Sequence, residues 1–310
     1  MSGDRVAVAA AAVHVPGIAP ERLIASATEP DCGPDEAHTL LGRKGLLFKE
    51  PAVRIAMCAV HRALGLPPGR PTAPVPGAAG TAVVVSSNLG NVATVCDIVD
   101  QVRAGGLRGV SPMQAPNASS NIVASSIAIR YGFTGPNLMV CSGATGGLDA
   151  VRLGALLVRS GRAPRVVVVG AEPADEVATR LRADAGLPAG PSQGMAACVV
   201  LAPAERPGGV RLHSVRRHRA PEAMPADGPP TIRLACGTGS GGGADEDLAA
   251  LVNAGYGATG VLQTALAARW LADPASRPAG VDEAAEAALT CGSAGDGFAT
   301  ARLYRDGAGT

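Results

Sequence analysis

The chain has 310 residues, 47% of them hydrophobic and 17% charged, so it can fill a sizeable core in one large domain or two small ones. Only 2% of the residues are aromatic, so the core must consist of Val, Leu, Ile and Ala. This composition favours layers of helix and sheet over an aromatic-rich β-sandwich. The formal net charge of +1 leaves no basic surplus to neutralise phosphates and argues against a nucleic-acid partner.

No segment of the sequence has the uninterrupted apolar run that a bilayer span requires, so we expect no membrane partner. The first residues read MSGDRVAVAAAAVHVPG, in which a charge precedes a short Ala/Val stretch, as in a signal peptide. No clear cleavage site follows this stretch, which favours a buried first strand instead.

The cysteines are scattered along the chain and form no CxxC pair, so the spacing of a zinc ribbon is absent. We therefore expect neither a metal nor a cofactor, and we expect most of these thiols to be buried in a reduced, cytoplasmic protein. The seven cysteines are Cys32, Cys58, Cys96, Cys141, Cys198, Cys236 and Cys291.

The first 180 residues alternate between short apolar runs and amphipathic segments. We predict strands at 5–13, 81–87, 138–140 and 165–172, and helices at 48–66, 90–106, 117–132 and about 147–159. Asn117 or Ser119 is the expected cap of the third helix, and Gly132 is its expected end. The last strand–helix–strand unit predicts a right-handed parallel crossover, and its run of valines is typical of a central strand.

Residues 181–230 are rich in Pro, Arg and Ala and look irregular, apart from predicted strands at 195–203 and 209–218. The alternation then resumes with a strand at 231–239, helices at 244–255 and 260–274, and a closing strand at 298–306. Leu262, Leu266 and Trp270 form an apolar stripe on the second of these helices. We predict a pseudo-duplicated α/β fold with halves 1–180 and 181–310 in a single compact unit.

A glycine-rich corner lies between the strand at 138–140 and the following helix, with the sequence VCSGATGGLDA. Backbone N–H groups at such a corner favour a developing anion, and a nucleophile elbow uses this geometry. The residue at the tip is Ala144, which carries no nucleophile. From spacing alone, a plain βα turn with closely packed glycines is the simpler interpretation.

A second glycine-rich stretch, GTGSGG at 237–242, is close to a dinucleotide-binding fingerprint and suggests a rival oxidoreductase function. The helix predicted after it opens with Asp245, Glu246 and Asp247, whose charges would repel a pyrophosphate. None of the five histidines lies in a recognisable motif, and no GxSxG is present around Ser142, which argues against a hydrolase.

Four segments taken together resemble the ketosynthase branch of the thiolase superfamily. They read SPMQAPNASSNIVASSIAIRYGFTGPNLMV at 111–140, CGTGS at 236–240, NAGYGATGVLQTALA at 253–267 and CGSAGDGFATARL at 291–303. The resemblance implies a thiolase-like fold, in which duplicated βαβαβ halves form an α-β-α-β-α layered architecture. It also implies a cysteine nucleophile and two histidines for condensation.

This sequence departs from that pattern at each of those positions. Ala144 stands at the cysteine position and cannot form a thioester, Cys236 stands at the first histidine position, and Tyr256 lies at the second. The supporting lysine is also missing from LVNAG at 251–255. The resemblance therefore implies that the chain has no condensing activity of its own.

The corner sequence ATGGLDA is similar to the QAGGLDA of chain length factors, the silent ketosynthase homologues of type II polyketide synthases. This implies a heterodimer with an active ketosynthase, served by an acyl carrier protein, in which the silent subunit completes the acyl tunnel and limits chain length. The Ala in place of Gln and the short 181–230 region indicate a divergent group, such as partners in highly reducing, polyene-forming systems. Residues implied to line the tunnel are Met113, Gln114, Asn117, Phe133 and Phe298.

A rival function on the same fold is an acyltransferase or thioesterase that uses Cys141 or Cys236 as its nucleophile. Cys141 lies three residues before the tip of the corner, which places it close to the nucleophile position but out of line with it.

Overall fold

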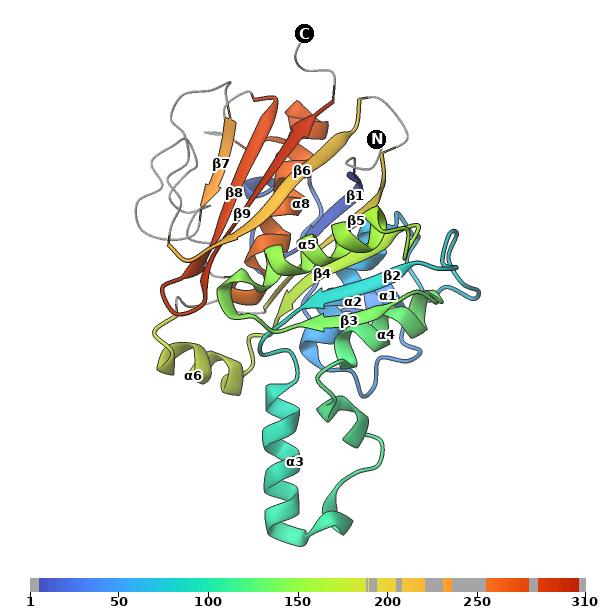
Figure 1. The fold of residues 1–310 in the computed structure, drawn as a ribbon. Helices are drawn as coiled ribbons and strands as arrows, with labels where there is room; N and C mark the ends of the chain where they lie inside the picture. The colour runs from blue at the N-terminus through green and yellow to red at the C-terminus, as the bar shows by residue number, and fades with distance from the viewer. Residues whose placement is uncertain are drawn as a thin grey trace.

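The computed structural model describes residues 6–187, 189, 194–204, 208–220, 231–235, 255–278 and 284–306. Within these residues, nine strands form one mixed sheet in the order β3-β2-β4-β5-β1-β6-β9-β8-β7 (Figure 1). The strands are β1 Val6–His14, β2 Ala82–Ser86, β3 Asn137–Val140, β4 Val166–Glu172, β5 Met195–Pro203, β6 Val210–His218, β7 Thr231–Ala235, β8 Glu286–Ser293 and β9 Gly297–Arg305.

The sheet consists of two half-sheets with the same pairing pattern. In the first, β2 and β4 are parallel, β5 is antiparallel to β4, and β1 is antiparallel to β5. In the second, β7 and β8 are parallel, β9 is antiparallel to β8, and β6 is antiparallel to β9. The first half-sheet has an additional strand, β3, parallel to β2. This repetition confirms the predicted pseudo-duplication.

Among the described strands, the two half-sheets pair with each other only where β1 meets β6, through the pairs Val6↔Leu212 and Ala7↔Arg211. The strand β5 follows the predicted boundary at residue 180 in the chain but pairs with strands of the first half. On this pairing, we propose that the halves meet between β5 and β6. The division at 180 stays a prediction.

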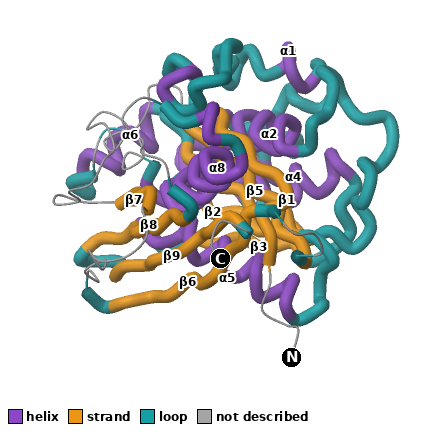
Figure 2. The backbone as a smooth tube through the Cα atoms, turned by 90° about the horizontal axis from the view of Figure 1, so that it is seen from above, coloured by secondary structure: helices purple, strands orange, loops and turns teal. Residues whose placement is uncertain are grey.

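The helices complete a layered arrangement around the half-sheets. Helices α5 (Gly146–Arg159) and α8 (Thr259–Ala272) contact strands of both halves and lie between them (Figure 2). Helices α2 (Pro51–Ala63) and α4 (Ile122–Tyr131) cover the outer face of the first half-sheet. The helix predicted at 244–255 lies outside the described residues, apart from Gly255.

The central helices approach each other closely because both carry glycine at the contact. A Cβ atom on Gly147 would lie 2.5 Å from the backbone nitrogen of Gly260, and one on Gly260 would lie 2.3 Å from the backbone nitrogen of Leu148. The apolar stripe of α8 is fully buried in the core. Its Trp270 donates a hydrogen bond of 2.9 Å to the carbonyl oxygen of Leu23.

Most predicted elements are confirmed to within a few residues, with three corrections. The helix expected at 117–132 begins only at Ile122, and Asn117 lies in the preceding 3-10 helix η3 (Ala115–Ala118), where its amide donates to the carbonyl of Phe48 at 2.5 Å. Gly132 ends α4 in the left-handed conformation, as expected. The sequence reading missed β8, whose alanines carry little strand propensity, and the amphipathic helix α6 (Glu176–Asp184), which extends into the supposedly irregular region.

One part of the molecule projects away from the layers. Helix α3 (Val92–Gly105) and the 3-10 helix η2 (Leu107–Gly109) form this arm together with η3, and α3 has no buried residue (Figure 1). Several of its apolar side chains are exposed, including Leu107 at 83% and Met113 at 61%.

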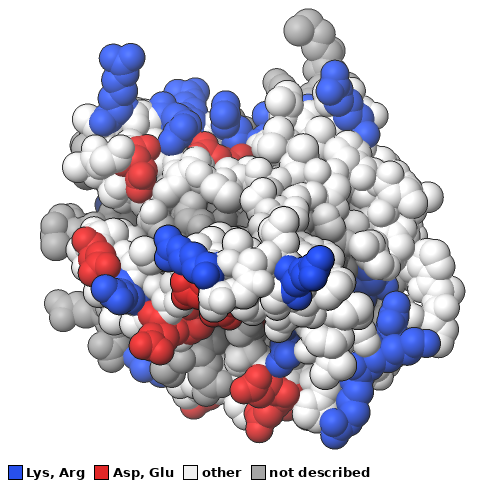
Figure 3. Space-filling view, turned by 90° about the horizontal axis from the view of Figure 1, so that it is seen from below, with Lys and Arg blue, Asp and Glu red and all other residues white. Residues whose placement is uncertain are grey.

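Figure 3 shows the molecule from the side on which this arm projects. Charged side chains of both signs are scattered over a largely uncharged face.

Among the described helices, none combines the length and the apolarity that a bilayer span needs. The cytoplasmic location stays a prediction. The remaining described helices are η1 Pro20–Arg22, α1 His38–Leu41, η4 Gly143–Thr145, η5 Tyr256–Ala258 and η6 Pro274–Ser276.

The glycine contact gives a test of the packing. Gly147→Ala should lower the free energy of unfolding by about 3 kcal/mol, because the new methyl group meets backbone atoms that cannot move aside. Chemical denaturation monitored by circular dichroism measures this change. The matched control is Gly105→Ala at the end of α3, where a Cβ atom meets nothing within 4 Å and the change should be neutral or slightly stabilising. Equal effects of the two substitutions would contradict the proposed contact.

Candidate functional site

The corner between β3 and α5 has the geometry of a nucleophile elbow. The chain leaves β3 at Val140 and turns sharply at Gly143, whose φ is +65°. It then passes through η4 into α5, and the methyl group of Ala144 at the tip is buried at 7% exposure. Ala144 therefore occupies the predicted position, and an alanine there offers no atom that can bond an acyl group.

A carboxylate from the second half of the chain closes the elbow. Asp296, in the turn between β8 and β9, accepts a hydrogen bond of 2.9 Å from the backbone N–H of Ala144. The Ser293 hydroxyl donates to the same carboxylate oxygen at 2.9 Å and holds it in place. A Cβ atom on Gly143 would lie only 2.2 Å from this carboxylate, so only glycine allows the approach. The N–H at the tip is therefore already bonded to an anion of the protein itself.

Buried polar side chains fix the first turn of α5. Asp149 accepts hydrogen bonds from the hydroxyls of Ser142 (2.6 Å) and Thr145 (2.8 Å). Arg217 extends from β6 towards the elbow, and its guanidinium lies 3.5 Å from the Asp149 carboxylate. It also donates hydrogen bonds to the Thr145 hydroxyl at 2.7 Å and to the Asp296 carbonyl at 3.1 Å. One arginine of the second half-sheet thus holds both sides of the elbow together.

A second polar chain supports the elbow from β4. The Asn88 side chain donates to the carbonyl of Gly143 at 3.1 Å and accepts from its N–H at 3.2 Å. Glu172, at the end of β4, accepts from the backbone N–H groups of Asn88 (2.7 Å) and Leu89 (3.0 Å). Burial raises the pKa of the Glu172 carboxyl to about 7, although these two donors and the Arg182 guanidinium favour its ionised form.

Tyr256 lies beside the elbow at the start of η5, which packs against η4. It has a φ of 43°, a left-handed conformation that costs a non-glycine residue energy and often marks a functional site. Its ring lies 5.9 Å from the guanidinium carbon of Arg182, and burial raises the pKa of its phenol. The structure therefore brings Tyr256 and Ala144 together, whereas Cys236 lies outside the described residues, as do the GTGSGG stretch and its acidic neighbours.

The five residues implied to line a tunnel do not form one cluster. Phe298 begins β9 next to the elbow loop, where it pairs with Gly292 and His218. Met113 and Gln114 are exposed on the arm, and Asn117 is buried at its base. Phe133 lies in the core beyond the end of α4, with its ring centroid 5.8 Å from that of Tyr131. Their role in holding an acyl chain stays a prediction.

The thiol of Cys141 has the environment of a poor nucleophile. It donates a hydrogen bond of 3.1 Å to the carbonyl of Ser87, and burial together with the nearby Glu172 charge raises its pKa. A raised thiol pKa reduces the thiolate fraction that attacks an acyl group. The polar chains through Asp149, Asp296 and Glu172 were missed in the sequence, because their partners are up to 152 residues away in the chain.

The titration of Glu172 can be tested through stability. A folded-state pKa of about 7, above the ordinary 4.5, means that the protonated carboxyl stabilises the fold below pH 4.5 and that this contribution is lost as the pH rises through 7. Between pH 4.5 and pH 7, the free energy of unfolding of the wild type should fall by about 3 kcal/mol relative to that of Glu172→Gln. Urea denaturation across this pH range measures the loss, and the exposed Glu176→Gln control should follow wild type. Parallel curves for wild type and Glu172→Gln would show that burial does not govern this carboxyl.

Comparison with known proteins identifies the family. A family profile for the β-ketoacyl synthase N-terminal domain matches residues 34–195, which is more than half of the chain. A chain of the structure described as the ishigamide ketosynthase/chain length factor matches with a TM-score of 0.69 and 21% identity, over 98% of this chain and 100% of that chain.

Two further solved structures share this fold. One is AntDE:AntF, described as a type II polyketide synthase acyl-carrier protein in complex with its ketosynthase bound to the hexaketide. It matches with a TM-score of 0.67 and 14% identity over 98% of this chain and 99% of that chain. The other is the ketosynthase from module 1 of the bacillaene synthase of Bacillus amyloliquefaciens. It matches with a TM-score of 0.58 and 14% identity over 100% of this chain and 77% of that chain. These likenesses confirm the predicted thiolase-like ketosynthase fold, and the family profile shows that the chain belongs to the β-ketoacyl synthase family.

Proposed function

We propose that this chain is a non-catalytic subunit of the chain length factor type, which pairs with an active ketosynthase and limits the length of its polyketide product. The observation that carries this proposal is the state of the elbow. The corner keeps its full geometry, but the side chain at its tip is the methyl group of Ala144, and the backbone N–H there donates to Asp296 at 2.9 Å.

The carboxylate at the elbow argues against chemistry at this position. A condensing or hydrolytic site needs N–H donors that are free to bind a developing oxyanion. Here a protein carboxylate already accepts from the tip, and a second anion beside it would be repelled. The elbow is therefore retained as part of the packing, and the absent nucleophile and the occupied N–H both support catalytic silence.

The arm supports a partner subunit. Helix α3 buries none of its residues within the chain and exposes the apolar side chains of Val95 and Val99, and η2 exposes that of Leu107. An apolar helix of this kind is covered in a stable assembly, since large exposed apolar patches mark interaction sites. The ishigamide ketosynthase/chain length factor and AntDE:AntF are themselves described as assemblies. By analogy, we propose a ketosynthase as the partner and an acyl carrier protein as the donor of the chain.

The arm also carries three of the five tunnel candidates, Met113, Gln114 and Asn117. If the partner packs on the arm, Met113 leaves solvent and faces the interface, where a growing acyl chain would meet it. Phe298, next to the elbow, would line the other end.

The proposal is tested by intact-mass spectrometry of this chain together with its candidate ketosynthase partner, after incubation with malonyl- and acyl-loaded carrier protein. We expect the chains to co-purify one to one and only the ketosynthase to gain an acyl adduct. Ala144→Cys should not create condensation, because no histidine stands at Tyr256 or Cys236. Acylation of this chain at Cys141 or Cys236 would instead establish the rival acyltransferase or thioesterase function.

The limiting role predicts a shift in product length. Met113→Trp should shift the products of the complex towards shorter chains, because the larger side chain excludes volume from the tunnel. Product profiles from mass spectrometry of the reconstituted complex measure the shift. The control is Leu156→Trp on the surface of α5, also an exposed apolar position, which should leave the profile unchanged. An unchanged profile in both variants would remove Met113 from the tunnel.

A further inference from the structure

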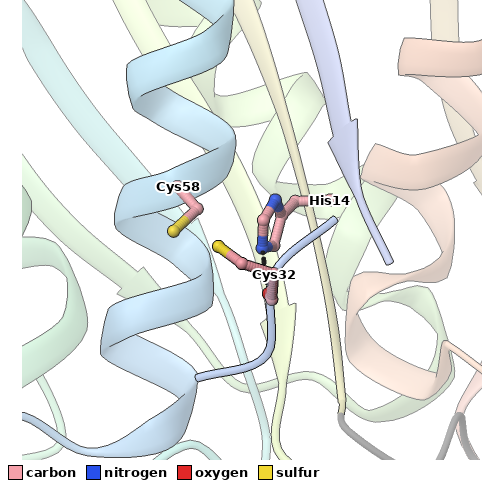
Figure 4. Close-up of side chains that lie close together, drawn as sticks. All are labelled: His14, Cys32 and Cys58. Atoms are coloured by element: carbon pink, nitrogen blue, oxygen red, sulfur yellow. Dashed lines mark hydrogen bonds between the residues drawn. The ribbon is translucent and has the colours of Figure 1, made fainter. Parts of the chain in front are cut away.

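A second group of reactive side chains lies outside the elbow, on the outer side of the first half-sheet. It consists of His14 at the end of β1, Cys58 in α2, and Cys32 in the segment between them (Figure 4). One nitrogen of the His14 ring and the two sulfur atoms all lie within 4.8 Å of one another. Figure 4 shows the two sulfur atoms pointing towards each other, and the His14 ring beside Cys32.

Each nitrogen of the His14 ring faces an oxygen atom of the protein. Nδ1 lies 3.3 Å from the Asp31 carboxylate, and Nε2 lies 3.0 Å from the carbonyl oxygen of Cys32. Asp31 is itself fixed by Arg62 at 3.1 Å and by the backbone N–H of Val15 at 2.6 Å. Because Nε2 faces the Cys32 carbonyl and Nδ1 is within ion-pair distance of the Asp31 carboxylate, the arrangement favours thiol chemistry over coordination of a metal ion.

The surroundings make the two thiols unequal. The Cys58 thiol beside the Cys32 sulfur, together with His14, lowers the pKa of Cys32 to about 4 despite its partial burial. The same pairing and full burial raise the pKa of Cys58. Burial lowers the pKa of His14, but the Asp31 carboxylate and Cys32 outweigh burial and raise it to about 8, so the ring is cationic beside the sulfur at neutral pH.

The two cysteines also differ in their exposure to solvent. Cys32 is partly exposed, and Cys58 is fully buried. A solvent-accessible thiolate next to a buried second thiol is the arrangement of a cysteine that reacts with an oxidant and is then resolved by its neighbour. The other described cysteines differ. Cys198 and Cys291 are buried, Cys141 has a raised pKa, and Cys96 is exposed on α3 and does not belong to the described His14 cluster.

We propose that Cys32 is a peroxide-reactive thiol and that Cys58 resolves its oxidised form into a Cys32–Cys58 disulfide. The Cys32 thiolate attacks one oxygen of hydrogen peroxide, the O–O bond breaks, and Cys32 sulfenic acid and hydroxide form. The Cys58 sulfur then attacks the Cys32 sulfur, the S–O bond breaks, and the thiol proton leaves with the hydroxyl group as water. The new bond ties the segment after β1 to α2. This inference does not depend on the function of the elbow.

Peptide mapping of the full chain tests the proposal without any substitution. Trypsin releases Cys32 in Leu23–Arg43 and Cys58 in Ile55–Arg62, each as the sole cysteine of its peptide. After limited peroxide treatment and alkylation, we expect these two peptides to be linked, with a loss of two hydrogen atoms in intact mass. Reduction should separate them. Unlinked peptides, or faster oxidation of Cys96 or Cys141, would overturn the proposal.

Variants separate the two roles. Cys58→Ala should halt Cys32 at the sulfenic acid, which dimedone captures, and Cys32→Ser should leave Cys58 unoxidised. The matched control is Cys96→Ser, in which the disulfide should form as in wild type. Alkylation of Cys32 in the reduced wild-type chain should be at least about 10-fold faster than that of Cys96. A stoichiometric metal ion in the purified chain that is lost in Cys32→Ser would mean a metal site, and the proposal would fail.

Discussion

The close approach of α5 and α8 is the constraint on which the rest of the structure depends. These helices form the layer between the two half-sheets, and each touches strands from both. Gly147 and Gly260 remove the side chains from the crossing, so backbone meets backbone there. Buried polar groups then connect this layer to the sheets, since the Gln263 amide donates to the carbonyls of Leu234 at 3.2 Å and Thr290 at 3.0 Å. A duplicated chain can pack as one unit only if this shared layer is thin.

The same constraint explains why the elbow geometry is kept although Ala144 at its tip carries no nucleophile. The first residues of α5 are at once the corner after β3 and one side of the helix crossing, so the corner cannot be rebuilt without disturbing the core. The side chain at the tip is different, because Ala144 precedes α5 and is not one of the residues at the Gly147–Gly260 contact. Ala144 is small enough for the site and chemically inert. Structure retained for packing thus carries no evidence of chemistry by itself.

Polar contacts join the two halves of the chain at the elbow. Arg217 of β6 reaches Asp149 and Thr145 of α5, and Asp296 of the β8–β9 turn reaches the backbone of Ala144. Each contact joins residues far apart in the chain and satisfies a group that would otherwise be left unpaired. The N–H group at the corner is therefore bonded to a carboxylate of the protein itself, so it is not free to bind another anion. The thiol pair at Cys32 and Cys58 lies apart from this network, on the outer face of the first half-sheet.

The sequence by itself determined the layered α/β class, most strands and helices, the pseudo-duplication and the lack of a nucleophile at Ala144. These features follow from local periodicity, glycine positions and the identity of single residues, all of which are written along the chain. Strand β8 was not predicted, because alanine-rich strands give no local signal. Helix α4 starts later than predicted, because the Asn117 side chain bonds the carbonyl of Phe48, which is remote in sequence. Only the tertiary structure decided that Asp296 closes the elbow, that Glu172 supports it through Asn88, and that His14 and two distant cysteines meet. The physical reason is that such contacts depend on how the half-sheets and the central helices pack, and no local pattern records which distant side chains that packing brings within a few ångströms.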